Sequence, residues 1–159
     1  MQRIVFTYGT LYIDDIIKAL LGRVPVNFYA TLSGYSIYKG NFSQLAPKIK
    51  KFFITKNPDE TAFSYLFAKE DRKNNFIIKG RAYEINSEEE RILDHWERYP
   101  DWYRKKTVVI KAIDGVKHEA FIYTLDIDGE KVEKFKRVVN NRAKVLARAK
   151  AVRARVLEK

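Results

Sequence analysis

The sequence has no cysteine among its 159 residues, and this absence removes several kinds of chemistry. Disulfide bonds, thiolate metal sites and a cysteine nucleophile are all excluded. No apolar stretch approaches the roughly 20 residues that a membrane-spanning helix needs. The N-terminal "MQRIVFTYGTL" also lacks the basic region and long apolar region of a signal peptide. We therefore expect a soluble, cytoplasmic protein that does not contact a membrane.

Several catalytic and cofactor-binding motifs are missing as well. No serine lies in a hydrolase-type elbow, and no glycine-rich phosphate loop or dinucleotide-binding loop is present. His95 and His118 are the only histidines, and they lack metal-binding spacing. We expect both to be structural or surface residues. The sequence thus predicts neither a metal nor a cofactor, and it favours a cofactor-free reaction over phosphoryl or hydride transfer.

Positive charge is concentrated at the C-terminal end of the chain. The net charge is +11, and residues 131–159 carry eleven Lys or Arg and two Glu, so they hold nine of these charges. A basic segment of this kind points toward anionic partners. An apolar stripe with a seven-residue spacing also crosses this segment, as expected for an amphipathic helix. Its members are Phe135, Val138, Val145, Ala149, Val152 and Val156.

Three interpretations of this basic segment stay open. In the first, residues 131–159 form a solvated helix whose apolar stripe docks on the body of the protein or on a second subunit. In the second, they contact nucleic acid or another polyanion, with the salt dependence that phosphate contacts confer. In the third, they are a disordered end. Phe135 is the only aromatic residue there, and no DNA-binding motif is visible, so sequence-specific recognition is not expected.

The rest of the chain has the composition of a folded domain, with 46% hydrophobic and 14% aromatic residues. Strands outnumber helices and do not alternate with them regularly, which predicts an α+β fold with a mostly antiparallel or mixed sheet. We expect one domain over residues 1–128 and a basic amphipathic helix over 129–159. Strands are predicted for residues 2–7, 27–32, 35–40, 63–69, 76–85, 107–113 and 118–125, and helices for 13–21 and 87–98, while 45–55 fits either.

Local signals support three of these elements. Gly22 directly follows the first predicted helix, as a helix-ending residue does. Ser87 and Glu90 have the spacing of a capping box for the helix over 87–98, and Pro100 is expected to end it. Asp114-Gly115 predicts a hairpin between the last two strands.

The stretch Tyr8-Gly9-Thr10-Leu11 is the first candidate for a functional site. It lies where a strand becomes a loop before a helix, and glycine allows a tight turn that leaves backbone amides exposed. Such amides can hold a carboxylate or an oxyanion. The plain alternative is an ordinary turn between a strand and a helix.

Glu97 is the second candidate. Trp96 precedes it, and Tyr99, Trp102 and Tyr103 follow within six residues. If these rings enclose the carboxylate, desolvation raises its pKa toward neutrality and makes it a usable base. The plain alternative is a glutamate on the solvated face of an amphipathic helix.

Three stretches together resemble the γ-glutamylcyclotransferase family. They are "VFTYGTL", "KGRAYEI" with the following "EEERILDHWE", and Tyr103 six residues after Glu97, with "AFIYTL" closing the body. The resemblance covers residues 3–126, and the "YGTL" form looks more like the γ-glutamylamine-type and AIG2-like members. It departs from the family pattern at Arg98, where glycine is frequent, and at Lys105, where arginine is frequent.

The resemblance implies a small mixed, barrel-like sheet with surrounding helices. It implies that the amides of Tyr8, Gly9, Thr10 and Leu11 bind the glutamyl end of a substrate. Glu97 is then the catalytic carboxylate, and Tyr103 and Tyr123 line or close the pocket. The implied reaction converts a γ-glutamyl compound to 5-oxoproline and a free amine. The alternative is a binding module of the same fold that holds a small ligand without turnover.

Overall fold

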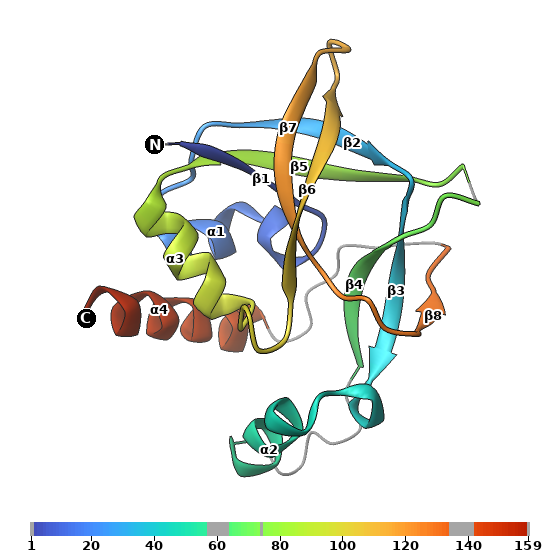
Figure 1. Ribbon diagram of the computed structural model, residues 1–159. Coiled ribbons are helices and arrows are strands. Elements are labelled where there is room, and N and C mark those ends of the chain that lie inside the picture. The colour runs from blue at the N-terminus through green and yellow to red at the C-terminus, as the bar shows by residue number, and fades with distance from the viewer. Residues whose placement is uncertain (1, 57–63, 74, 134–141, 159) are drawn as a thin grey trace.

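The structure of the protein is a computed structural model that describes residues 2–56, 64–73, 75–133 and 142–158 (Figure 1). Within these residues the chain forms a strand-rich body with four α-helices. Its elements are β1 (Arg3–Thr7), α1 (Asp14–Leu21), β2 (Asn27–Ser33), β3 (Tyr35–Asn41), α2 (Pro47–Lys56), β4 (Ser64–Glu70), β5 (Ile77–Ile85), α3 (Ser87–Trp96), β6 (Arg104–Ala112), β7 (Lys117–Thr124), β8 (Glu130–Lys131) and α4 (Arg142–Leu157).

The strands form one mixed sheet that closes on itself. The order is β1-β5-β2-β6-β7-β4-β3-β8, and a further parallel pairing of β1 with β7 joins the first strand to the fifth. β1, β5, β2, β6 and β7 therefore form a closed barrel. β4 adds to β7 in parallel and carries β3 and β8 outward. The predicted mixed, barrel-like sheet and the α+β class are confirmed.

Three of the helices lie together against the barrel. α4 packs on α1 and α3, and Figure 1 shows these three on one side of the sheet, with α2 apart from them near the ends of β3 and β4. The larger of two core clusters fills the space between these helices and the sheet. None of the helices in the described ranges is long and apolar enough to cross a membrane.

Gly80 shows why the barrel needs a residue without a side chain in β5. A Cβ atom at this position would lie 2.4 Å from the carbonyl oxygen of Thr7 and 2.4 Å from the ring of Phe6. Real Cβ contacts are longer, so a side chain would push β1 away from β5. The glycine of "KGRAYEI" thus lets β1 reach the point where "YGTL" begins.

Two helix-end predictions were wrong in detail. α3 is capped by Asn86, whose side chain accepts from the amide of Glu89 (2.8 Å) while Glu89 accepts from the amide of Asn86 (3.1 Å). The capping box therefore lies one residue before the predicted Ser87 and Glu90, because asparagine is an equally good cap and comes first. At the other end, α3 stops at Trp96, well before Pro100.

Several strand and turn predictions were confirmed, with one change in pairing. β6 and β7 form the hairpin around Asp114-Gly115, and Gly115 has a φ of 89°. β2 and β3 flank Gly34 as predicted, but they pair with different neighbours in the sheet. The ambiguous stretch 45–55 contributes to the helix α2.

The C-terminal segment does not begin as a helix at residue 129. Glu130 and Lys131 instead form β8 beside β3, and the helix α4 begins at Arg142. Phe135 and Val138 of the predicted stripe lie outside the described residues. The remaining stripe faces the body: Ala149, Val152 and Val156 are buried in the main core cluster, and Val145 packs against it.

Candidate active site

Glu97 occupies an ordered helix end. The amide of Arg98 donates to the carbonyl of His95 (3.3 Å). The amide of Tyr99 donates to the carbonyl of Asp94 (2.8 Å). These two bonds define a Schellman motif, in which the last carbonyls of a helix are satisfied by the residues that follow it. Glu97 is the C-cap residue of α3, so its backbone is fixed by the helix.

Arg98 adopts the left-handed conformation that this motif requires, with φ at 53°. For a residue with a Cβ this conformation costs about 1–2 kcal/mol, which explains why glycine is usual at such a position. The departure from the family pattern at Arg98 therefore preserves the backbone that glycine would adopt. Glu97 is not displaced by it.

The Glu97 carboxylate is held in an environment that disfavours its charge. Glu97 is partly buried, and no hydrogen bond or ion pair to its carboxylate is formed by the residues that the structure describes. Burial raises the pKa of Glu97 to about 7, and the positive charge of Arg148 acts in the opposite direction. A carboxyl group with this pKa can both accept and donate a proton near neutral pH. Burial thus has the effect on the pKa of Glu97 that the sequence analysis described, and the role of Glu97 as a base stays a prediction.

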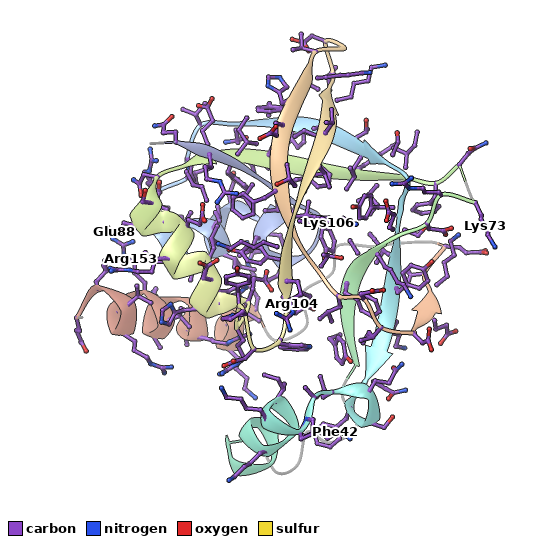
Figure 2. All side chains as sticks on the ribbon, viewed as in Figure 1. Phe42, Lys73, Glu88, Arg104, Lys106 and Arg153 are labelled. Carbon is purple, nitrogen blue, oxygen red and sulfur yellow. The ribbon has the colours of Figure 1, made fainter. Side chains whose placement is uncertain are left out.

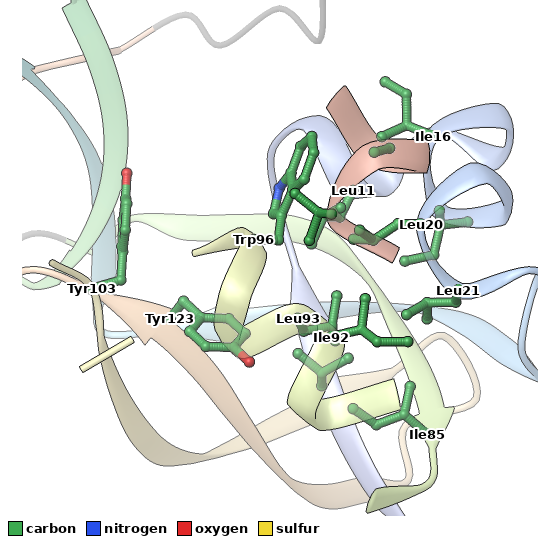
Figure 3. Packing of buried hydrophobic residues seen from close by; sticks show 14 of the residues in the cluster. Leu11, Ile16, Leu20, Leu21, Ile85, Ile92, Leu93, Trp96, Tyr103 and Tyr123 are labelled. Carbon is green, nitrogen blue, oxygen red and sulfur yellow. The ribbon is translucent and has the colours of Figure 1, made fainter. Parts of the chain in front are cut away.

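Three tyrosines predicted from the sequence surround this carboxylate. Burial raises the pKa values of Tyr8, Tyr103 and Tyr123, and the negative charge of Glu97 contributes to each of these shifts. The three phenols therefore stay protonated over the physiological range. Figure 3 shows Tyr123 beside α3, whose last residue is Trp96, and Tyr103 farther out on the other side of Tyr123. The fold thus brings the end of β1, the start of β6 and the end of β7 to the Glu97 side chain.

The hydroxyl groups of these tyrosines are engaged within the protein. Tyr8 donates to the carbonyl of Tyr123 (2.9 Å) and accepts from the amide of Ala68 (2.9 Å). Tyr103 donates to the carbonyl of Leu66 (2.7 Å). These bonds hold β1 and β6 against β4 and β7. The hydroxyl groups of Tyr8 and Tyr103 therefore have a supporting role in the fold.

The "YGTL" stretch ends β1 and opens into a short 3-10 turn over Thr10–Tyr12. The first amides of a helical turn have no partner within it. The amides of Gly9, Thr10 and Leu11 have no acceptor among the described residues. A Cβ atom built on Gly9 would meet no heavy atom within 4 Å, so the space beside it is open. Among the described residues nothing occupies these amides, so they are open to an anion, and the binding of a carboxylate there stays a prediction.

Two residues of β5 hold the other side of this turn. Tyr83, which is fully buried, donates from its hydroxyl to the carbonyl of Leu11 (3.0 Å). Arg81 donates to the carbonyl of Tyr12 (3.1 Å) and also contacts Asp14. These bonds hold the carbonyls of Leu11 and Tyr12 against β5. The "GRAYEI" strand, to which the sequence analysis gave no separate role, therefore orients the turn.

A charged network fastens α3 to the strand that follows it. Lys105 donates to Glu90 (2.8 Å) and Asp94 (2.9 Å). Asp94 also accepts from the hydroxyl of Tyr123 (2.7 Å). Glu90 in turn pairs with Arg3 of β1 (2.8 Å). Lys105, the second departure from the family pattern, thus bridges two carboxylates as a compact cation, a role that does not need the planar fork of arginine.

Sequence reasoning missed Arg81, Tyr83, Asp94 and Arg148 as neighbours of the site. The position of Asp94 within "ILDHWE", one helical turn before Glu97, could have indicated that both lie on the same face of α3. Arg148 carried no such signal, because it is one of several cations in α4. Both histidines behave as expected: His95 contacts the carbonyl of Arg91, and His118 packs on Phe28.

Comparison with known families gives one match that covers most of the chain. A family described as gamma-glutamyl cyclotransferase, AIG2-like, matches residues 5–141. This range contains the "YGTL" turn, β5, α3 and the strand pair β6–β7. No curated protein matches the chain.

Solved structures of similar fold agree with this match. One described as a gamma-glutamyl cyclotransferase has a TM-score of 0.63 at 13% identity, covering 82% of this chain and 70% of its own. A protein from Arabidopsis thaliana has a TM-score of 0.54 at 21% identity, covering 96% and 87%. An AIG2-like protein from Mus musculus has a TM-score of 0.53 at 17% identity, covering 78% and 77%. At these identities the structures establish a shared fold.

Proposed function

The chain belongs to the gamma-glutamyl cyclotransferase, AIG2-like family, and from this premise we propose that it converts a γ-glutamyl compound to 5-oxoproline and a free amine. Two observations support the proposal. The Glu97 carboxyl group has no hydrogen bond or ion pair to the described residues, and its pKa is raised to about 7. Its charge also raises the pKa of Tyr8, which lies 89 residues away along the chain and opens a turn whose amides have no acceptor among the described residues.

The reaction is an intramolecular aminolysis and needs no second substrate. The α-amine nitrogen of the glutamyl group attacks the γ-carbonyl carbon, a new C–N bond closes a five-membered lactam, and the original amide C–N bond breaks. Because both reacting groups are in one molecule, binding the folded conformer supplies much of the acceleration, with effective molarities that reach about 10⁵ M or more. The remaining task is proton transfer: the α-ammonium loses two protons as it becomes the lactam N–H, and the leaving nitrogen takes up two and departs as an ammonium.

Glu97 is suited to this proton transfer. In its ionised form it accepts a proton from the α-ammonium, and in its protonated form it donates to the departing amine. A pKa of about 7 makes both forms accessible near neutral pH. The amides of Gly9, Thr10 and Leu11 are the donors that we assign to the α-carboxylate of the glutamyl group. The rings of Tyr8, Tyr103 and Tyr123 limit the access of water to the Glu97 carboxylate.

The two departures from the family pattern are compatible with this activity. Arg98 keeps the left-handed backbone of a glycine, and Lys105 keeps α3 attached to β6. The competing function is a binding module that holds a γ-glutamyl or related carboxylate without turning it over. A raised pKa at Glu97 favours the enzyme, because a purely binding site for an anion has no need of a protonatable carboxyl group.

An assay for 5-oxoproline release against a panel of γ-glutamyl amines, γ-glutamyl amino acids and glutathione tests the proposal. We expect release from at least one member, with kcat/KM rising with pH through about 7 as Glu97 loses its proton. Tight binding of a γ-glutamyl compound in calorimetry, with no product from any member, would instead establish the binding module.

Tyr103→Phe should affect turnover much less than changes at Glu97. The ring stays in place, and the lost bond to the carbonyl of Leu66 costs about 1 kcal/mol of stability. We expect kcat/KM to fall by less than about tenfold, since no proton transfer is assigned to this hydroxyl. A loss as large as that of a Glu97 variant, in a protein with a normal melting curve, would assign Tyr103 a direct part in the chemistry.

A further inference from the structure

Arg148 reaches the site from outside the region that matches the family. The family match ends at residue 141, and Arg148 lies on α4, which follows it. Its Nη2 atom donates to the carbonyl oxygen of Trp96 at 3.2 Å, and its Cζ atom lies 4.2 Å from the centre of the Trp96 ring. Trp96 is the residue directly before Glu97. A cation is thus fixed by two contacts at the end of α3.

The packing of α4 determines where this guanidinium lies. Ala149 is fully buried and Val152 is 9% exposed, so the helix face next to Arg148 is held in the core. Arg142, which lies about one and a half turns before Arg148 on α4, pairs with Asp15 of α1. α4 touches both α1 and α3, and it lies beside α3 in Figure 1. The position of Arg148 therefore follows from a docked helix.

The other ionisable groups around Glu97 do not duplicate this charge. Tyr8 of the "YGTL" stretch, Tyr103 before β6 and Tyr123 of β7 are neutral phenols, and Asp94 of α3 is occupied by Lys105 and Tyr123. Arg98 directly follows Glu97 in the chain. The charges that shift the pKa of Arg98 are those of Arg148, Arg155 and Asp101. Within the described residues, Arg148 is the one charged group that shifts the pKa of Glu97.

We propose that Arg148 is a positioning residue for the cyclisation: its guanidinium, fixed against the carbonyl and ring of Trp96, places a positive charge at the end of α3 beside the residue that acts as the base. This inference rests on the proposed function. It extends the catalytic unit beyond the family domain, because α4 then contributes to the reaction as well as to the core. Arg148 is exposed as a residue, but its guanidinium is partly desolvated where it meets Trp96, which lowers its pKa.

The test compares Arg148→Gln, Arg148→Lys and the control Lys150→Gln, which removes one exposed positive charge from the same helix. We expect Arg148→Gln to move the acid limb of the kcat/KM profile upward by about 1 pH unit, with activity near wild type at pH 9. Arg148→Lys should restore most of the shift, and Lys150→Gln should leave the profile unchanged. An unmoved acid limb in Arg148→Gln would overturn the proposal. If KM alone rose while the acid limb stayed in place, Arg148 would be assigned to substrate binding instead.

A second measurement separates this proposal from the activity itself. NMR titration of the side-chain carboxyl carbons, with the Glu97 signal assigned by its loss in Glu97→Gln, follows the ionisation of Glu97 without any substrate. An upward shift in Arg148→Gln supports the role of Arg148 in holding Glu97 ionised, even if no γ-glutamyl compound is turned over. An unchanged titration would refute that role, whatever the assay for 5-oxoproline gives.

Discussion

Replacing Glu97 by glutamine should abolish the release of 5-oxoproline while the protein stays folded. Glutamine is nearly the same size as glutamate but cannot accept and return a proton. General acid–base catalysis contributes about 10²–10⁴-fold, so we expect kcat/KM to fall at least by this factor. Substrate binding should change little, because the amides of the "YGTL" turn are assigned to the glutamyl carboxylate. The measurement is the initial rate of 5-oxoproline formation, with binding followed separately by calorimetry.

The same variant should be more stable than the wild type at alkaline pH. Burial raises the pKa of Glu97 to about 7, so the folded protein binds its proton more tightly than the unfolded chain does. The stability that this proton contributes is present at low pH and is lost as pH rises through the folded pKa. Glu97→Gln removes that loss. The melting temperature of Glu97→Gln should exceed that of the wild type most above pH 7, and this difference should shrink as pH falls from 7 toward the ordinary pKa of glutamate.

Glu88→Gln is the matched control for both readouts. Glu88 lies in the first turn of the same helix, is exposed, and is labelled in Figure 2. The same chemical change there should leave kcat/KM within about twofold of the wild-type value. It should also leave the stability nearly unchanged, since surface substitutions seldom alter it by more than about 0.5 kcal/mol. Near-wild-type turnover in Glu97→Gln would remove Glu97 from the catalytic role.

The effect of the Glu97 charge on Tyr8, the first residue of the "YGTL" turn, was predictable from the sequence only through a resemblance. Each stretch alone fits a plain structural role, and neither periodicity nor composition brings residue 97 to residues 8–11. The contact of Tyr8 with Tyr123 depends on the parallel pairing of β1 with β7, which joins strands more than a hundred residues apart. Such a pairing has no local signal, whereas the hairpin at Asp114-Gly115 has one and was predicted directly.

The errors of the sequence analysis have local physical causes. Asn86 is as good a helix cap as Ser87, so the capping box could begin at either residue. The end of α3 depends on the left-handed Arg98, and arginine is not a residue that predicts this conformation. The role of Arg81 and Tyr83 depends on Gly80, because the close approach of β1 to β5 places their side chains under the turn. A glycine in a strand shows that something approaches closely, but it does not show what.

Replacing Val156 by asparagine should destabilise the whole protein by about 3 kcal/mol. Val156 is 2% exposed and belongs to the main core cluster, together with Ala149 and Val152 of the same helix. Burying an amide without a partner costs about 1–3 kcal/mol, and the lost burial of a valine adds to this. For a chain of this size, we expect the melting temperature to fall by about 6–12 °C. Thermal unfolding followed by circular dichroism measures this shift.

Ala154→Asn is the control that separates docking from helix propensity. Ala154 is exposed two residues before Val156, so the same asparagine there should cost only the propensity difference, about 0.6 kcal/mol. If α4 were a free basic arm, the two variants would behave alike, and the helix would not belong to the core. A large difference between them means that the segment outside the family match is part of the folded unit. Val156→Asn should then also move Arg148 away from Trp96, so that its residual activity shows the raised acid limb expected of Arg148→Gln.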